Sequence, residues 1–193
     1  MAKPEPPAAK KDQEDDAPFL GTEFLTWIWW SAETRGGLHA VGDDQRVGVM
    51  LDRVLEFKDD VTGVKVAVRG DAPTRAPEAR EALARGMTLE RAGVVIAIDS
   101  ENTMVVLDGA TMDLRGVKAE TQPEGESAED RDANALATLF GMLEALDKVY
   151  RAFVLERTSP AFVRDVAPKI VDWAKSARRS RSAARPKATS ETA

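Results

Sequence analysis

The 193-residue chain contains no cysteine, one histidine and one tyrosine. Without cysteine it has no disulfide, no thiolate nucleophile and no cysteine-ligated zinc site. It has no run of about 18 apolar residues, so we expect no transmembrane helix. Its N-terminal segment lacks the apolar region of a signal peptide. Together these absences suit a reducing compartment, and we expect a cytoplasmic protein.

Motifs for phosphate binding and catalysis are also missing, since neither GxxxxGK[ST] nor GxGxxG occurs. His39 follows two glycines and has no evident serine or cysteine partner, so we interpret it as a solvated loop residue rather than a general base. The pairs Asp43–Asp44 and Asp59–Asp60 fall in predicted turns, where carboxylates commonly bind local backbone rather than metal. We predict a non-enzyme without metal, cofactor or small-molecule substrate.

Charge is unevenly distributed along the chain. The net charge is −6, yet residues 175–193 carry six basic residues against one acidic residue, so the remainder is acidic. A free-standing DNA-binding domain is normally basic over one face, which an acidic body does not favour. The basic end can still contact phosphate. The candidate nucleic-acid contacts there are Lys175, Arg178, Arg179, Arg181, Arg185 and Lys187.

Composition divides the chain into three parts. Residues 1–17 are rich in Pro, Ala, Lys and Asp and have no apolar periodicity, and residues 175–193 are equally polar. We predict that both are disordered, because neither buries enough apolar surface to offset the entropy of ordering. Residues 18–174 contain segments with strand or helix periodicity and are predicted to form a single α+β domain.

The stretch FLTWIWW, residues 24–30, holds three of the four tryptophans. It lies in a helix predicted to start at an N-cap on Thr22 and to end at Gly36–Gly37. Exposed tryptophans can stack on nucleic-acid bases, but Glu23 and Glu33 flank this cluster where lysine or arginine would be expected. The stretch is also too short to cross a membrane. We predict that it is buried, in the core or in a subunit contact. The residues concerned are Phe24, Trp27, Ile28 and Trp30.

The next region predicts an antiparallel sheet. Residues 45–69 alternate with period two and are read as three strands. A short helix from Pro77 to Gly86 follows, with Arg80 and Arg85 directed outward. Two further strands and an edge strand at LRGVKAE come next. With the helices on either side, this order is typical of an α+β domain.

A long helix is predicted over residues 130–156. Its apolar residues follow a 3-4-3-4-3 heptad spacing, which favours an intrachain seam over a dimer zipper because fewer than four heptads are present. A last helix follows Pro160. The apolar surface of the long helix and the aromatic helix exceeds what one sheet face covers, so we expect a homodimer. The seam residues are Leu136, Leu139, Leu143, Leu146, Tyr150 and Phe153.

Three segments, taken in order, resemble the C-terminal half of the RdgC family of recombination-associated proteins. They are FLTWIWW, then VRGDAPTRAPEAREALARGMTLERAGVVIAIDSENTMVVLDGATMDLRGVKAE, then, after an acidic break, NALATLFGMLEALDKVYRAF. The resemblance spans about residues 19–157. It implies a bacterial, nucleoid-associated dimer that closes around duplex DNA without sequence preference and restrains RecA-driven recombination. The family's N-terminal half has no counterpart here.

Two functions therefore stand as expectations. The first is a non-enzymatic, sequence-independent double-stranded DNA-associated protein of RdgC type, located at the nucleoid. In this function the domain would contribute further DNA contacts besides those of the basic C-terminal end, namely Arg35, Arg75, Arg80 and Arg85. The second is a protein–protein interaction module that keeps this fold and has lost DNA binding. The two differ in whether the arginines converge on one face.

Overall fold

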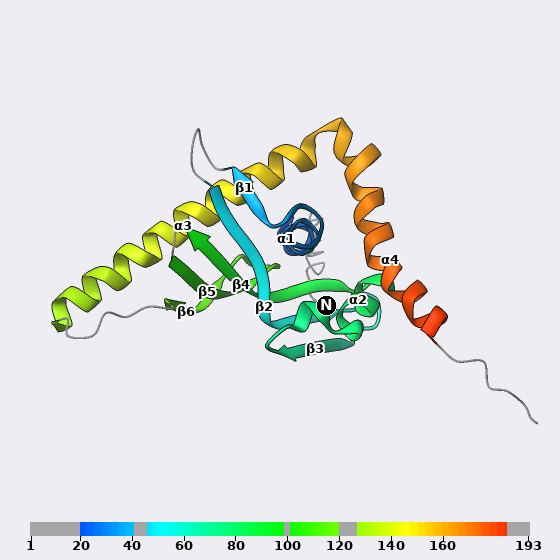
Figure 1. Cartoon of the computed structure of the whole chain (residues 1–193), viewed down its shortest axis with the longest axis horizontal. Helices are drawn as coiled ribbons and strands as arrows, with labels where there is room; N and C mark the ends of the chain where they lie inside the picture. The colour runs from blue at the N-terminus through cyan, green and yellow to red at the C-terminus, as the bar shows by residue number, and fades with distance from the viewer. Residues whose placement is uncertain (1–19, 41–45, 99–100, 120–126, 185–193) are drawn as a thin grey trace, which may run out of the picture.

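The computed structural model describes residues 20–40, 46–98, 101–119 and 127–184. It confirms an α+β fold with an antiparallel sheet (Figure 1). The 3-10 turn η1 and the π-helical turn η2 separate some of the regular elements. In chain order the elements are α1 (Gly21–Arg35), β1 (Leu38–Ala40), β2 (Arg46–Lys58), β3 (Lys65–Gly70), η1 (Pro73–Arg75), α2 (Pro77–Ala84), β4 (Thr88–Ile98), β5 (Glu101–Asp108), β6 (Leu114–Ala119), α3 (Ala128–Thr158), η2 (Phe162–Val166) and α4 (Ala167–Ala184).

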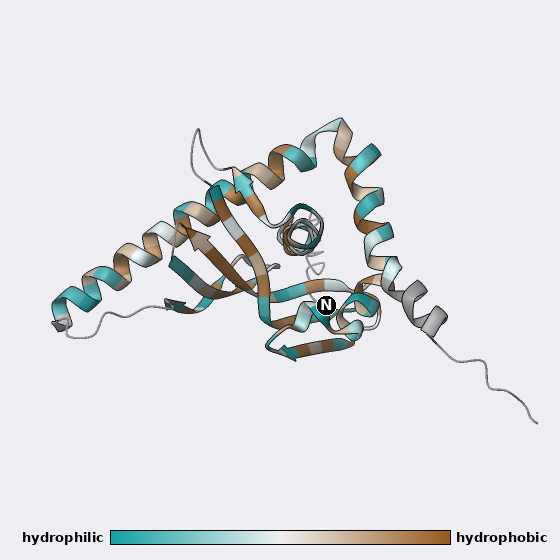
Figure 2. Ribbon diagram, viewed as in Figure 1, coloured by the Kyte–Doolittle hydropathy of each residue, from teal (hydrophilic) through white to brown (hydrophobic). Residues whose placement is uncertain are grey.

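The sheet has the strand order β1-β2-β4-β5-β6, with β3 paired to β2 on the same side as β1. Val49 pairs with Ile96 and Leu51 pairs with Val94, and all four side chains are buried. In β2 the buried residues alternate with exposed or half-buried neighbours, which is the period of two expected for a sheet with one covered face. Figure 2 shows the apolar stretches of β2 and β4 in brown beside α1.

Strand β2 differs from the prediction of two separate strands over its length. It is continuous, but its register with β4 jumps from Leu51 to Leu55 at a β-bulge. Arg53 in the bulge adopts a left-handed backbone with φ of 65°. A Cβ built on Gly93 would lie 2.1 Å from the Asp52 carbonyl oxygen, so only glycine fits beneath the bulge. The extra residues bend the strand while keeping its apolar residues on the covered face.

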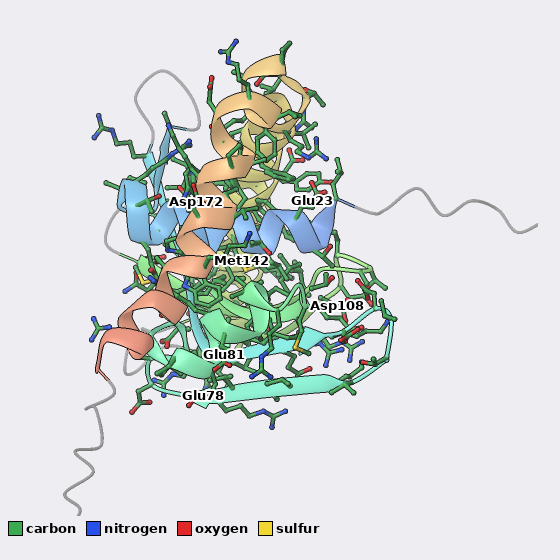
Figure 3. All side chains as sticks on the ribbon, turned by 90° about the vertical axis from the view of Figure 1, so that its right-hand side faces the viewer. Glu23, Glu78, Glu81, Asp108, Met142 and Asp172 are labelled. Atoms are coloured by element: carbon green, nitrogen blue, oxygen red, sulfur yellow. The ribbon has the colours of Figure 1, made fainter. Side chains whose placement is uncertain are left out.

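Helix α1 is surrounded on several sides, as its apolar character in all directions predicts. Figure 1 shows it end-on, framed by α3, α4 and the sheet. Phe24 and Trp27 lie 5.5 and 5.4 Å from Phe153 of α3, measured between ring centroids. On the opposite flank Trp29 meets Trp173 of α4 edge-on at 5.1 Å. Figure 3, turned by 90°, shows α4 crossing in front of α1.

The start of α1 differs from the prediction. The residue before the helix is Leu20, which makes no side-chain cap, and Thr22 lies inside the first turn, where its carbonyl accepts a hydrogen bond from Thr26 Oγ1. Burial of the helix, rather than a polar cap, therefore stabilises this end. The predicted end is correct, because Gly36 takes the left-handed conformation that closes the helix.

Helix α3 buries a different stripe from the predicted heptad seam. Leu146 and Phe153 are buried and Leu139 and Tyr150 are half-buried, but Leu136 and Leu143 are 55% and 37% exposed. Residues 129–137 are all exposed, because this end of α3 reaches past the strands (Figure 1), so the start of the seam has no surface to pack against. The side chains that fill the contact instead include Met142, Ala145 and Val149.

Helix α4 extends beyond the predicted end of the domain. We expected disorder from residue 175, but the helix continues to Ala184. Trp173 and Ala174 are buried and hold its middle against the body. The alanines and arginines that follow are strong helix formers, and extending an existing helix requires no new nucleation. Composition alone did not reveal this helical extension. Residues 1–17 and 185–193 lie outside the described residues.

Candidate functional site

The tryptophan cluster is part of the core, as predicted. Trp27, Trp29 and Trp30 are 3%, 0% and 4% exposed. Phe24 and Ile28 are fully buried beside them. Base stacking needs an exposed ring face, so these residues do not form a nucleic-acid platform. No helix in the described part of the chain is both long enough and apolar enough to cross a membrane.

Each buried indole N–H of Trp27 and Trp29 donates to a glutamate. Trp27 Nε1 lies 2.7 Å from Glu156 Oε2, and Arg35 donates to both oxygens of the same carboxylate, at 3.2 and 2.9 Å. Burial alone would raise the pKa of Glu156, but the hydrogen bonds from Arg35 and Trp27 outweigh it and hold the pKa below its ordinary value. Arg35 also lies over the ring of Trp30. This cluster joins α1 to α3.

A second cluster joins α1 to α2 and α4 through Glu33. Its Oε1 accepts from Trp29 Nε1 at 2.7 Å, and its Oε2 accepts from Trp173 Nε1 at 3.1 Å. Arg80 of α2 pairs with the same carboxylate, and its guanidinium lies 5.0 Å from the Trp173 ring centroid. Burial lowers the pKa of Arg80. The prediction that Arg80 points outward is therefore wrong, because the indoles it covers were not identifiable as neighbours from sequence spacing.

His39 is not a solvated loop residue, which corrects our interpretation. It lies in β1 and is 8% exposed, with its ring 4.9 Å from the Trp27 ring. Burial, followed by the nearby charge of Arg35, lowers the pKa of His39, while Glu156 acts in the opposite direction. Its Nε2 is buried without a hydrogen-bond partner. The neutral imidazole is thus the form that the fold accommodates.

Of the four predicted body arginines, Arg75 and Arg80 line the same surface hollow, whereas Arg35 pairs with Glu156 of α3 and Arg85 pairs with Glu81 of α2. Arg35 and Arg80 belong to the two separate glutamate clusters. Arg85 pairs with Glu81 one helical turn away on α2. Arg75 is exposed at the end of η1 and lines a surface hollow of about 960 Å³ between α1 and α2. Three of the four positive charges therefore face carboxylates of the same chain.

The basic C-terminal residues are placed differently. Lys175 is exposed on α4. Arg178, Arg179 and Arg181 lie on the helical extension of α4. Arg185 and Lys187 lie outside the described residues. The C-terminal series of basic residues therefore begins on α4, a helix whose Trp173 is buried against the rest of the domain.

The carboxylates of Asp59 and Asp108 bind groups of the same chain. Asp59 Oδ1 accepts from the backbone N–H groups of Val61 and Thr62, which lower the pKa of Asp59. Asp108 accepts from the backbone of its own turn and pairs with Arg91. In the described ranges no group of three or more His, Asp or Glu residues could hold a metal ion. Asp43 and Asp44 lie outside those ranges.

The sequence analysis did not identify Glu33 and Glu156, whose carboxylates accept hydrogen bonds from the tryptophan indoles. The spacing of four between Trp29 and Glu33 on one helix is a usable signal for their hydrogen bond. No comparable signal links Glu156 to Trp27, because 129 residues separate them. Figure 3 labels Glu78 and Glu81 on α2 and Asp172 on α4.

Comparison of the chain with protein-family models, with curated proteins and with solved structures gave no match. The resemblance to the RdgC family therefore depends on the three sequence segments alone and stays a prediction.

Proposed function

We propose that this chain is a non-enzymatic protein of RdgC type that associates with duplex DNA without sequence preference, through the basic end of α4. The observation that carries the proposal is the helical extension of α4 to Ala184, on which positions 178, 179 and 181 are arginines. By position, residues 175, 178 and 179 share one face of a helix. A helix ordered before binding loses less entropy on contact than a disordered tail.

The pairing of Arg35, Arg80 and Arg85 within the chain narrows the proposed contact to this end. Six basic residues can neutralise at most about six phosphates, so the slope of log K against log salt should be no steeper than about −5. The acidic body repels the same duplex. Binding should therefore be weak at physiological salt. Through such contacts the protein would act at the nucleoid and modulate recombination.

The test replaces the six basic C-terminal residues by glutamine, which retains helix propensity. Deletion after Ala174 is less informative, because it ends the helix beside the buried Trp173. A matched control replaces six exposed basic residues of the body and changes the net charge equally. These control residues are Arg53, Lys65, Arg69, Arg115, Arg151 and Arg164.

Binding to a duplex of arbitrary sequence is measured by fluorescence anisotropy at several salt concentrations. We expect the C-terminal variant to lose binding and the control to retain most of it. Equal loss in both variants would show that only overall charge matters. No binding by the unmodified chain at about 20 mM salt would refute the proposal.

A protein–protein interaction module is the second candidate. It is favoured by apolar side chains exposed on one side of α3, namely Leu136, Phe140 and Leu143, which are 55%, 66% and 37% exposed. An exposed apolar cluster of this kind marks an interaction surface more often than an isolated apolar residue does. If the chain does not bind DNA but binds another protein through these apolar residues, the interaction module is the better account of its function.

A further inference from the structure

Strand β2 has an uncovered stretch in the middle of its outer edge. Strand β1 pairs with β2 at residues 46–48, and β3 pairs with it at residues 53–58. Both lie on the side of β2 away from β4, one toward each end of the strand (Figure 1). Residues 49–52 therefore form a sheet edge about 13 Å long, which no strand of the described chain covers.

The backbone of Leu51 points toward this open edge. The Val49 N–H donates to the Gly37 carbonyl oxygen at 2.8 Å, so the peptide groups of Val49 face the β1 side of β2. Peptide groups alternate in direction along a strand, and the register with β4 is regular from Val49 to Leu51. The N–H and C=O of Leu51 therefore face the same side, between the ends of β1 and β3. Such an edge is a template for main-chain pairing with another segment.

The hollow of about 960 Å³ between α1 and α2 lies against this edge and includes Leu51 in its lining. On the face of the sheet that α1 covers, its lining includes Trp29 and Ala32. On the opposite face it includes Leu38 and Met50, which are 59% and 51% exposed. A volume of this size and a mainly apolar lining are typical of ligand-binding pockets.

The hollow carries a positive charge. The charged residues of the described chain that line it are Glu33, Arg75 and Arg80. Glu33 pairs with Arg80 and accepts from two indole N–H groups, so these two charges cancel. Arg75 is exposed, and within the described ranges no carboxylate pairs with it. Its guanidinium is therefore available to bind a carboxylate through two parallel hydrogen bonds.

We propose that this hollow binds the C-terminal residue of an extended peptide from another protein, with apolar side chains at its last two positions. The main chain of the last residue pairs with the N–H and C=O of Leu51, and its terminal carboxylate binds Arg75. Its side chain enters the hollow on the face toward α1, because paired residues of neighbouring strands direct their side chains to one face. The preceding side chain points to the opposite face, over Leu38 and Met50.

Three separate features favour this occupant. The open edge matches a peptide main chain, Arg75 matches a terminal carboxylate, and the apolar lining matches the side chains. A continuous strand does not fit, because β1 and β3 close the edge at both ends. A DNA phosphate would match Arg75 but neither the open edge nor the apolar lining. The site is independent of the DNA contact proposed for α4, and it gives the interaction module a partner of defined chemistry.

The first test measures binding of a fluorescein-labelled hexapeptide to the full chain by fluorescence anisotropy, without DNA. The peptide consists of glycine and serine and ends in valine and leucine with a free carboxylate. We expect a dissociation constant of about 100 µM or below. The same peptide with a C-terminal amide should bind at least roughly 10-fold more weakly, because it lacks the charge that Arg75 recognises. No binding of the acid at about 500 µM chain, or equal binding of acid and amide, would overturn the proposal.

Substitutions at the rim test the two side-chain contacts. Arg75→Gln should weaken binding of the acid at least roughly 10-fold. Arg115→Gln is its control, since this side chain is 63% exposed and lies on β6, away from the hollow. Met50→Asp should have a comparable effect, and Val61→Asp, at a 95% exposed position, is its control. Circular dichroism checks that each variant is folded. Unchanged affinity in Arg75→Gln would refute the carboxylate contact.

Amide hydrogen exchange followed by NMR tests the main-chain contact. In the chain without peptide the Leu51 N–H should exchange faster than the Val49 N–H, which donates to Gly37. Saturating acid peptide should slow exchange at Leu51 at least roughly 10-fold. Exchange at Leu51 as slow as at Val49 before peptide is added would show that the edge is already paired, and the proposal would fail. DNA enters none of these measurements, so failure here is distinguishable from failure of the α4 contact.

Discussion

Removal of the Glu33 carboxylate should destabilise the fold far more than removal of an ordinary surface glutamate. Glu33 accepts from the indoles of Trp29 and Trp173 and pairs with Arg80. Trp29 is fully buried and Trp173 is 9% exposed, so in Glu33→Ala two indole N–H groups lose their acceptor where little water reaches them. Each unsatisfied donor costs about 1–3 kcal/mol. With the loss of the Arg80 contact, we expect a decrease of about 3–5 kcal/mol in the free energy of unfolding.

The assay is urea unfolding followed by tryptophan fluorescence and by circular dichroism. Glu33→Gln should lose about 1–3 kcal/mol, because its amide oxygen can accept from one indole, while its NH2 group, which only donates, leaves the other indole without an acceptor. Glu144→Ala is the control, since Glu144 is 69% exposed and pairs with Lys148 on the same helix. It should change stability by less than about 0.5 kcal/mol. A Glu33→Ala variant as stable as Glu144→Ala would refute the idea that this carboxylate holds the three helices together.

Three further predictions concern the core. Trp27→Ala should cost about 3–5 kcal/mol in urea unfolding, because the ring is 3% exposed, and a cost below about 1 kcal/mol would contradict its role in the core. The pKa of the buried His39 is held below its ordinary value of 6.5, so its contribution to stability is present above that pH and is lost as pH falls through the folded pKa. His39→Phe should therefore flatten the stability profile between about pH 7 and 5, and an unchanged profile would assign this dependence to other groups. Gly93→Ala should destabilise the protein strongly, because the new Cβ would meet the Asp52 carbonyl oxygen. Gly141→Ala should stabilise it by about 1 kcal/mol in thermal unfolding, since nothing lies within 4 Å of the new Cβ on the helix. A stabilised Gly93→Ala variant or a destabilised Gly141→Ala variant would contradict these expectations.

Local patterns predicted much of the fold because they depend on near neighbours in the chain. The period of two over residues 45–69 predicted strands, and Gly36 marked the end of α1 through its left-handed backbone. The apolar character of FLTWIWW in all directions predicted a buried helix, and the structure places it at the centre. The joining of residues 46–58 into a single bulged strand was not predicted, since the bulge depends on the contact between Asp52 and Gly93 of the neighbouring strand.

The sequence by itself determined the α+β class, the burial of the tryptophans and the segregation of positive charge at the C-terminal end, since composition and periodicity carry that information. Only the tertiary structure decided which charged groups are paired and which apolar residues are covered. Glu156 meets Trp27 and Arg35 across more than 100 residues of chain, and no spacing rule applies over such a separation. Likewise Leu136 and Phe153 belong to one heptad pattern, yet the first is exposed and the second is buried, because α3 runs past the edge of the sheet that covers only part of it.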